Sequence, residues 1–420
     1  MASMADVSVA SPNAVIIVTS ENRDKALAGA PLFFKLACNL ASRIKFGSLA
    51  FVLPDGRTLK FLGQEEISSE GVILVKDYAF ARRAILGGDI GFYESFADDQ
   101  WDTPNLADCL YIFARNADYV REAFRAAPFI AWLDGVRHKL NKNTKSGSRR
   151  NIIAHYDLGN SFYEKWLDRT MTYSSALYPS PRADLAAAQT HKYEMLAKAI
   201  DLKPEDKVLE IGSGWGGFAE YAAKTCGAKV TGLTISPSQL EYARKRIFLE
   251  GLNEKVEFRL QDYRDVDGQF DKIASIEMFE AVGEEYWPTY FNKIKQALKP
   301  GGAAGLQVIT IANRFFDSYH KSTDFIQRHV FPGGVLPSPD ILKREIERAG
   351  LALKQAKSFG GDYARTLEEW RRRFLDAWDD IQPMGFDERF KKLWRFYLSY
   401  CEAGFRAGTI DVCQVAAVRE

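Results

Sequence analysis

The chain has 420 residues, a formal net charge of +1, and 46% hydrophobic and 26% charged residues. This length predicts two or three domains, and the balanced charge gives no global bias toward nucleic acid. The five cysteines form no closely spaced pairs, so we expect a reducing compartment without a disulfide framework or zinc site. Because no apolar run is long enough for a signal peptide or a transmembrane helix, we expect any membrane contact to be peripheral.

The N-terminal third has mixed local patterns. Residues 1–25 are small and polar, and we expect them to be disordered. Residues 26–136 are expected to form a smaller mixed α/β domain, with helices over 32–46, 77–86 and 106–113, a hairpin over 49–62 and a strand over 72–75. No cluster of catalytic residue types appears there. We therefore expect a binding or recruiting domain rather than a catalytic one.

A basic linker is expected over residues 137–150. It contains no acidic residue and six basic ones, Arg137, Lys139, Lys142, Lys145, Arg149 and Arg150. The segment fits a solvated linker equally well as a strip on anionic lipid headgroups, where each basic residue contributes about 1 kcal/mol. The sequence leaves both interpretations open.

Strands and helices alternate from residue 151 onward. Strands are expected over 207–211, 229–233, 256–260, 271–275 and 303–311, and helices over 184–200, 218–224, 237–250 and 286–298. This alternation predicts an α/β fold with a parallel sheet covered on both faces, which binds ligands at the carboxyl ends of its strands. The segment 312–365 interrupts the alternation and is expected to form an inserted lid. Amphipathic helices are expected over 366–405.

A glycine-rich turn follows the strand at 207–211. Its glycines let the backbone approach a ligand closely, because no Cβ stands in the way. Gly212, Gly214 and Gly217 fit the dinucleotide-binding pattern, which is a weak signal alone. Glu210 argues against a dinucleotide, since a carboxylate two residues before the first glycine can face a cationic ligand. The pattern predicts an S-adenosylmethionine pocket, with a plain αβ turn as the alternative.

Further motifs accompany this turn. The stretch 155–178 is both aromatic and polar, and short motifs follow at 232–236, 261–264, 278–283, 331–338, 361–366 and 403–407. In this combination the chain closely resembles the cyclopropane fatty acid synthase family of S-adenosylmethionine-dependent lipid methyltransferases, as a divergent member. The resemblance is specific from about residue 150 to the C-terminus and looser before it.

The resemblance implies a fold and a reaction. The fold is a Rossmann-like class I methyltransferase domain over 151–420 with an inserted lid, and the N-terminal domain docks on lipid or membrane. The reaction transfers a methylene or methyl group from S-adenosylmethionine to the double bond of an unsaturated phospholipid acyl chain, with a cyclopropane fatty acid as the main expected product. The alkene must be held dry and aligned, and a base must remove a proton from the resulting cation.

The resemblance also implies which residues hold the cofactor. They are Tyr173 and Ser174 at the methionine end, Glu210, Gly212, Gly214, Trp215 and Gly216 in the turn, Thr234, Ser236 and Gln239 near the ribose and methionine part, and Asp262 and Tyr263 at the adenine. Thr234 and Ser236 could instead be a helix N-cap pair.

The base is the point where this chain departs from the family. Typical members use a bicarbonate ion held by a Cys, a Glu, a His, a Tyr and backbone amides. Glu280 and Tyr363 match the Glu and the Tyr, while Ser175 replaces the Cys. Gln307 replaces the His, and Ile309 offers its backbone. Bicarbonate binding is left open. Without it, Glu280 could be the base, or a methyl-branched or methylene lipid could form instead of a ring.

Other readings also stay open. Cys401 matches a C-terminal cysteine of the family, which implies a place among the catalytic residues, but it could be a small buried hydrophobe. A small-molecule N-methyltransferase and a non-catalytic lipid-binding protein are the rival functions. No metal is expected, because the histidines lack partners at ligand spacing. The resemblance further implies a possible homodimer, located in the cytoplasm and peripherally bound to the inner face of the membrane.

Overall fold

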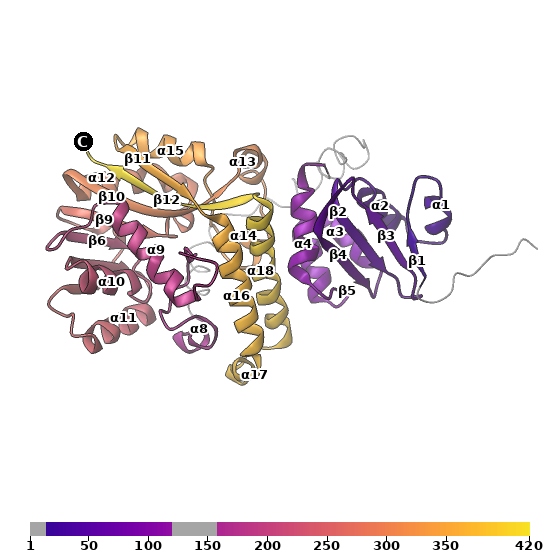
Figure 1. Ribbon diagram of the computed structural model, residues 1–420, viewed down its shortest axis with the longest axis horizontal. Helices are drawn as coiled ribbons and strands as arrows, with labels where there is room; N and C mark the ends of the chain where they lie inside the picture. The colour runs from indigo at the N-terminus through magenta and orange to yellow at the C-terminus, as the bar shows by residue number, and fades with distance from the viewer. Residues whose placement is uncertain (1–13, 120–157) are drawn as a thin grey trace, which may run out of the picture. The chain divides into compact units, whose positions relative to one another are not determined.

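The computed structural model describes residues 14–119 and 158–420 (Figure 1). Its tertiary contacts divide the chain into two units. One unit is Met1–Lys142 with Glu388–Ala403, and the other is Asn143–Asp387 with Gly404–Glu420. The predicted basic linker at 137–150 lies outside the described residues.

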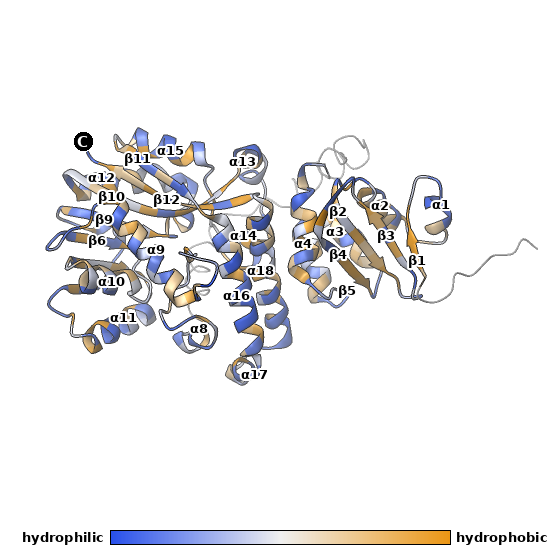
Figure 2. Cartoon of the chain, in the orientation of Figure 1, coloured by the Kyte–Doolittle hydropathy of each residue, from blue (hydrophilic) through white to orange (hydrophobic). Residues whose placement is uncertain are grey.

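The N-terminal unit contains a five-stranded sheet in the order β1-β3-β2-β4-β5. The strands are β1 (Val15–Ile17), β2 (Phe46–Val52), β3 (Thr58–Leu62), β4 (Glu65–Val75) and β5 (Trp101–Asp102), and the helices α1 (Arg23–Ala26), α2 (Leu32–Ala41), α3 (Ala79–Ala97) and α4 (Leu106–Arg115). Figure 2 shows apolar residues along these strands. The mixed α/β character and the β2–β3 hairpin are as predicted.

The predicted disorder of residues 1–25 is wrong for the part that the structure describes. The apolar run in β1 pairs in parallel with β3, with Val15 opposite Thr58 and Ile17 opposite Lys60. Strand addition satisfies the backbone groups of a short apolar segment that has no core of its own. Residues 1–13 lie outside the described residues.

Helix α18 (Glu388–Ala407) belongs for most of its length to the N-terminal unit. Phe396 is fully buried there and packs edge-on against Tyr93, with ring centroids 5.2 Å apart. At its exposed edge, Arg389 pairs with Asp98 at 2.9 Å. The predicted domain boundaries, which place all of 151–420 together, do not agree with this grouping. The apolar face of α18, and not its place in the sequence, decides which unit it packs in.

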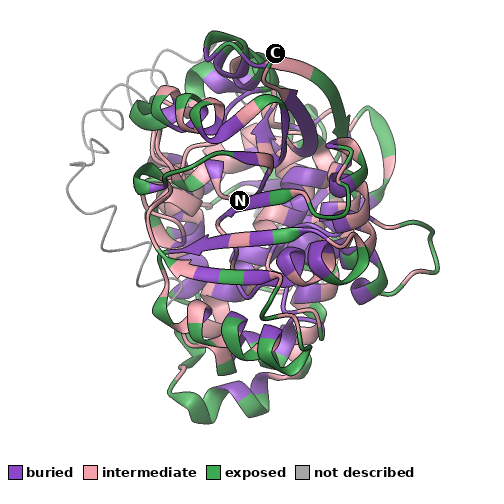
Figure 3. Ribbon diagram, turned by 90° about the vertical axis from the view of Figure 1, so that its left-hand side faces the viewer, coloured by how far each residue is buried: buried purple, intermediate pink, exposed green. Residues whose placement is uncertain are grey.

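The C-terminal unit contains a seven-stranded sheet in the order β11-β12-β10-β9-β6-β7-β8. Its strands are β6 (Lys207–Ile211), β7 (Lys229–Thr234), β8 (Val256–Leu260), β9 (Phe270–Ile276), β10 (Leu298–Ile311), β11 (Ala352–Ser358) and β12 (Ile410–Val418). All pairings are parallel except those of β12, which is antiparallel to β10 and β11. Consecutive residues of β6 are buried, so both faces of the sheet are covered (Figure 3). The predicted fold class is confirmed.

The helices of this unit include the four that the predicted alternation contains. They are α8 (Asn160–Trp166), α9 (Leu185–Ala199), α10 (Gly217–Thr225), α11 (Pro237–Leu249), α12 (Trp287–Ala297), α13 (Asn313–Tyr319), α14 (Phe325–His329), α15 (Pro339–Arg348), α16 (Gly360–Asp376) and α17 (Trp378–Ile381). Helix α15 packs against α12 and leads into strand β11. The inserted segment is therefore shorter than the predicted 312–365. Within the described residues, no helix has the length and apolar content to cross a bilayer.

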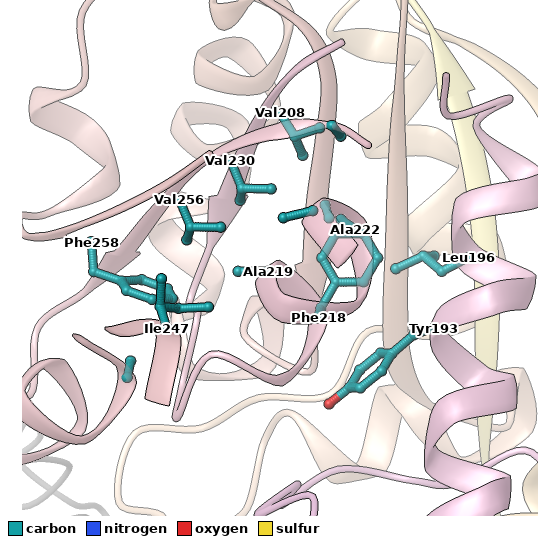
Figure 4. Packing of buried hydrophobic residues seen from close by; sticks show 14 residues of the cluster. Tyr193, Leu196, Val208, Phe218, Ala219, Ala222, Val230, Ile247, Val256 and Phe258 are labelled. Atoms are coloured by element: carbon teal, nitrogen blue, oxygen red, sulfur yellow. The ribbon is translucent and has the colours of Figure 1, made fainter. Parts of the chain in front are cut away.

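An apolar cluster includes residues of the strand and the helix that flank the glycine turn (Figure 4). It joins Val208 of β6, Phe218 of α10 and Phe258 of β8. A Cβ added at Gly216 would lie 2.9 Å from the Phe258 ring, and one at Gly232 would lie 2.5 Å from it. These two glycines are therefore needed to let the ring pack beneath the turn.

We expect Gly232→Ala to destabilise the protein by about 1–3 kcal/mol, because the new methyl group overpacks the core against Phe258. In a Phe258→Leu background the same change should cost less, since the smaller side chain leaves room. Urea unfolding of the two single variants and the double variant measures this coupling. An equal cost of Gly232→Ala in both backgrounds would contradict the packing account.

Candidate active site

The glycine turn lies between the carboxyl end of β6 and the start of α10. Gly212, Gly214 and Gly216 have φ values of +82°, +51° and +83°, a region that glycine adopts without strain. A Cβ at Gly214 would have no atom within 4 Å, whereas one at Gly212 would lie 2.9 Å from the Met278 side chain. The turn thus presents bare backbone to open space at Gly214.

Glu210 lies at the end of β6 and is 3% exposed. Its Oε2 has no hydrogen-bond partner, and the buried hydroxyl of Ser213 has none either. Burial raises the pKa of Glu210 well above its usual value, and the charge of Arg246 opposes this rise only in part. A buried carboxylate with an unused oxygen fits a cationic ligand, since an unpaired buried acceptor is costly. These residues fit S-adenosylmethionine, whose ammonium and sulfonium groups are both cationic.

The predicted residues after β7 form a helix cap. The Ser236 side chain accepts from the backbone N–H of Gln239 at 3.3 Å and caps α11. Thr234 Oγ1 donates to Gln239 Oε1 at 3.0 Å and accepts from the Ser236 N–H at 3.1 Å. The geometry therefore shows Ser236 as the helix cap, while Thr234 ends β7 and bonds to Ser236 and Gln239. A role of the same residues in cofactor binding stays a prediction.

After β8, the predicted adenine residues lie in a short 3-10 turn. The Asp262 carboxylate binds the guanidinium of Arg264 at 2.6 Å and accepts from its backbone N–H at 3.0 Å. The Tyr263 ring packs edge-on against Tyr290, with centroids 5.5 Å apart. Asp262 is thus held in place by Arg264, and its contact with adenine stays a prediction.

Aromatic rings gather where the resemblance places the methionine end of the cofactor. The Tyr173 ring contacts Trp370 and Trp166, with centroids 5.3 Å and 5.6 Å away. Trp215 donates from Nε1 to Asn160 Oδ1 at 2.8 Å. The Ser174 hydroxyl accepts a 2.6 Å bond from Lys192 Nζ. Lys192 is fully buried, and burial lowers its pKa to about 7.

Glu277, directly after β9, is a site residue that sequence reasoning missed. Its carboxylate accepts from the Ser175 backbone N–H at 2.8 Å, from Gln307 Nε2 at 2.7 Å and from the Tyr363 hydroxyl at 2.6 Å. Burial raises its pKa, while Lys192 and these three donors lower it. Ser175, Gln307 and Tyr363, the positions at which the resemblance places bicarbonate, are therefore brought together around a carboxylate that was not predicted. Its position directly after a parallel strand was the signal available in the sequence.

Glu280 lies one turn further along the chain. Its Oε1 accepts from the backbone N–H of Ile309, while Oε2 is buried and has no partner. Burial, together with the neighbouring charge of Glu277, raises the pKa of Glu280 to about 8, although the Ile309 bond opposes the rise. A carboxylate with this pKa binds a proton strongly once it is ionised, which is what a general base requires.

Two further predictions concern Cys401 and metals. Cys401 is partly buried on the part of α18 that groups with the N-terminal unit, so its proposed role near the site stays a prediction. Among the described side chains, no group of three His, Cys, Asp or Glu residues is placed to hold a metal ion.

The sheet topology and the glycine turn define a class I S-adenosylmethionine-dependent methyltransferase. A family model described as mycolic acid cyclopropane synthetase matches residues 143–415, and the chain belongs to this family of S-adenosylmethionine-dependent lipid methyltransferases. It is 37% identical to the tuberculostearic acid methyltransferase UfaA1 of Mycobacterium tuberculosis, over 89% of this chain and 88% of that protein. It is 36% identical to the cyclopropane-fatty-acyl-phospholipid synthase of Escherichia coli K12, over 84% and 89%.

Solved structures agree with this assignment. The cyclopropane synthase MmaA2 of Mycobacterium tuberculosis superposes with a TM-score of 0.61 at 27% identity, covering 66% of this chain and all of that chain. The mycolic acid cyclopropane synthase CmaA1, solved with SAH and CTAB, superposes with a TM-score of 0.60 at 27% identity, covering 64% and 97%. The recognised family and the methyltransferase activity are therefore confirmed.

Proposed function

We propose that this enzyme transfers a one-carbon unit from S-adenosylmethionine to the double bond of an unsaturated phospholipid acyl chain, and that the product is a cyclopropane. The observation that carries this proposal is the buried, unpartnered Oε2 of Glu280. A ring closes only if the transferred methyl group loses a proton, and this oxygen is able to take it. The relative named as a cyclopropane-fatty-acyl-phospholipid synthase supports the same reaction.

When bound, S-adenosylmethionine supplies an electrophilic methyl group. Transfer of that methyl group to the alkene would leave a carbocation on the lipid. Glu280 Oε2 then takes a proton from the new methyl group, and the freed electron pair closes the ring. The buried Glu210 carboxylate holds the cationic cofactor at the glycine turn.

Three aromatic residues have a part in this step. Tyr173, Trp370 and Trp166 contact one another in edge-on or tilted arrangements, in the region where the resemblance places the methyl donor. A nearby cation is attracted by the faces of such rings, by roughly 2 kcal/mol when water is excluded. We propose that these rings stabilise the carbocation until the proton leaves.

A second candidate product is a methylene or methyl-branched lipid. Ser175 and Gln307 stand where typical family members have Cys and His, and relatives are named as a tuberculostearic acid methyltransferase and as sphingolipid C9-methyltransferases. The methylene product also needs loss of one methyl proton, so Glu280 serves either outcome. A saturated methyl branch would in addition need a hydride donor.

Mass spectrometry and NMR of lipids from cells that express the chain and receive methyl-deuterated methionine would identify the product. We expect a gain of one carbon that carries two deuterium atoms, with the double bond replaced by a ring. Two deuterium atoms on an exocyclic double bond would establish the methylene product, and three would establish methyl transfer without loss of a methyl proton. Absence of label from lipid would refute the proposed substrate and point to an amine or to a binding role.

A further inference from the structure

Bicarbonate does not fit the site that the family resemblance assigns to it. The donors implied for that ion lie at Ser175, Gln307, Tyr363 and the backbone of Ile309. In the structure the first three donate to the carboxylate of Glu277, and Ile309 donates to Glu280. Each of these donors therefore already has an anionic partner from the chain itself. The Ser175 hydroxyl points elsewhere, because it donates to the Ala176 carbonyl at 2.9 Å.

We infer that the Glu277 carboxylate occupies the anion position of this site, so that the enzyme removes the methyl proton with its own carboxylates and without bicarbonate. This inference rests on the proposed function for the identity of the proton, but the occupancy of the anion position rests on the hydrogen bonds alone. Glu277 is a positioning residue, since both of its oxygens are engaged, while the free Oε2 belongs to Glu280.

The surrounding polar groups are arranged for a carboxylate at this place. Gln307 lies opposite Gln414 in the β10–β12 pairing, and Gln414 Nε2 donates to Gln307 Oε1 at 3.1 Å. This bond fixes the amide of Gln307 so that its NH₂ group faces Glu277. The positive charge of buried Lys192 also favours the ionised form of Glu277. A second anion would face both Glu277 and Glu280, and like charges at close range oppose its binding.

The backbone gives an independent indication. Glu277 has φ +51°, a left-handed conformation that costs a non-glycine residue about 1 kcal/mol or more. A glycine would adopt this turn freely, but it would leave the three donors without their carboxylate. The strained conformation turns the side chain into the site, as expected for a position kept for function rather than for stability.

The proton transfer needs no acceptor from outside the chain. A C–H bond of the transferred methyl group breaks, its electron pair forms the new carbon–carbon bond, and the proton passes to Glu280 Oε2. The negative charge of Glu277 favours protonation of Glu280, because it raises the pKa of that carboxyl group. Glu277 thus acts on the proton acceptor through its charge, in the place where an external ion would otherwise lie.

Bicarbonate dependence tests this inference. We expect wild-type turnover to change less than about twofold between carbonate-free buffer and buffer with added sodium bicarbonate. Glu277→Gly empties the anion position and relieves the left-handed backbone, so it should fold and lose about 100-fold in turnover in carbonate-free buffer. Added bicarbonate should raise the turnover of this variant at least about tenfold, since the freed donors can hold the ion.

Calorimetric titration with bicarbonate gives a second readout that needs no lipid. We expect no binding heat with the wild type and saturable binding with Glu277→Gly. The matched control is Glu205→Gly, which makes the same change at an exposed residue with φ +67° and should behave as wild type in both assays. Because the binding readout uses no acyl chain, it stands even where the proposed reaction is wrong.

Two results would overturn the inference. One is a wild-type enzyme that loses turnover in carbonate-free buffer and recovers with bicarbonate, or that binds bicarbonate in the calorimeter. The other is a folded Glu277→Gly variant that keeps full turnover without bicarbonate. The wild-type measurements decide the question by themselves if the variant does not fold.

Discussion

Gly214→Val is expected to weaken S-adenosylmethionine binding by about 100-fold or more, equivalent to about 2.7 kcal/mol. The Cβ position of Gly214 meets no atom within 4 Å, so the valine side chain would project into the open space that the glycine turn presents. Calorimetric titration of S-adenosylmethionine into the purified variant measures the loss.

The control for this change is Gly251→Val. Gly251 also has a left-handed backbone, with φ +66°, and also has no atom within 4 Å of its Cβ position, but it lies exposed after α11. Both variants place valine at a left-handed backbone position, so the difference between them isolates the effect on the pocket. Unchanged affinity in a folded Gly214→Val variant would remove the glycine turn from the cofactor site.

The parallel part of the sheet was predictable because each strand and helix carries its own local pattern. The apolar strand Lys207–Ile211 and the helix Pro237–Leu249 behind its Ser236 cap illustrate such local signals. Strand β12 was not predicted, although it lies between β10 and β11, because its place depends on pairing with residues far away in the sequence. The placement of α18 was missed for the same reason.

The candidate site shows the same division between local patterns, which could be predicted, and contacts between distant residues, which could not. The glycine turn and Glu280 were predicted because short motifs contain them. Glu277 was not predicted, since a lone acidic residue after a strand resembles many solvated carboxylates. Its importance depends on donors that lie 30 to 102 positions away in the sequence, from Gln307 to Ser175. Lys192 was missed for a related reason, because a lysine in a helix is usually exposed and only the tertiary structure buries it.

Glu280→Gln is expected to lower turnover by about 10²–10⁴-fold while S-adenosylmethionine affinity stays within about twofold of wild type. The amide keeps an oxygen for the Ile309 N–H but has no oxygen able to accept the methyl proton. Single-turnover formation of labelled lipid measures the chemical step, and calorimetry measures cofactor binding. Glu345→Gln is the matched control, because Glu345 is also buried with an unpartnered Oε2 but lies on α15.

The same variant should change how stability depends on pH. The folded protein raises the pKa of Glu280 from an ordinary value of 4.5 to about 8. The folded state therefore holds a proton that the unfolded state has released between these pH values, and the contribution of Glu280 to stability falls as pH rises from about 4.5 to about 8. Tyr290, Tyr319 and Cys413 also interact with Glu280, but burial raises their pKa values and keeps them neutral in this range.

Glutamine cannot ionise, so Glu280→Gln escapes this loss. We expect the variant to gain a few kcal/mol relative to wild type between pH 5 and pH 8.5, visible as a melting-temperature difference that grows with pH. Wild-type turnover should rise over the same interval, because the base must be ionised to accept the proton. A catalytic carboxylate in a partly buried site is expected to lower the stability of the protein while it serves turnover. A melting-temperature difference that stays constant with pH, in a variant with normal turnover, would exclude Glu280 as the base.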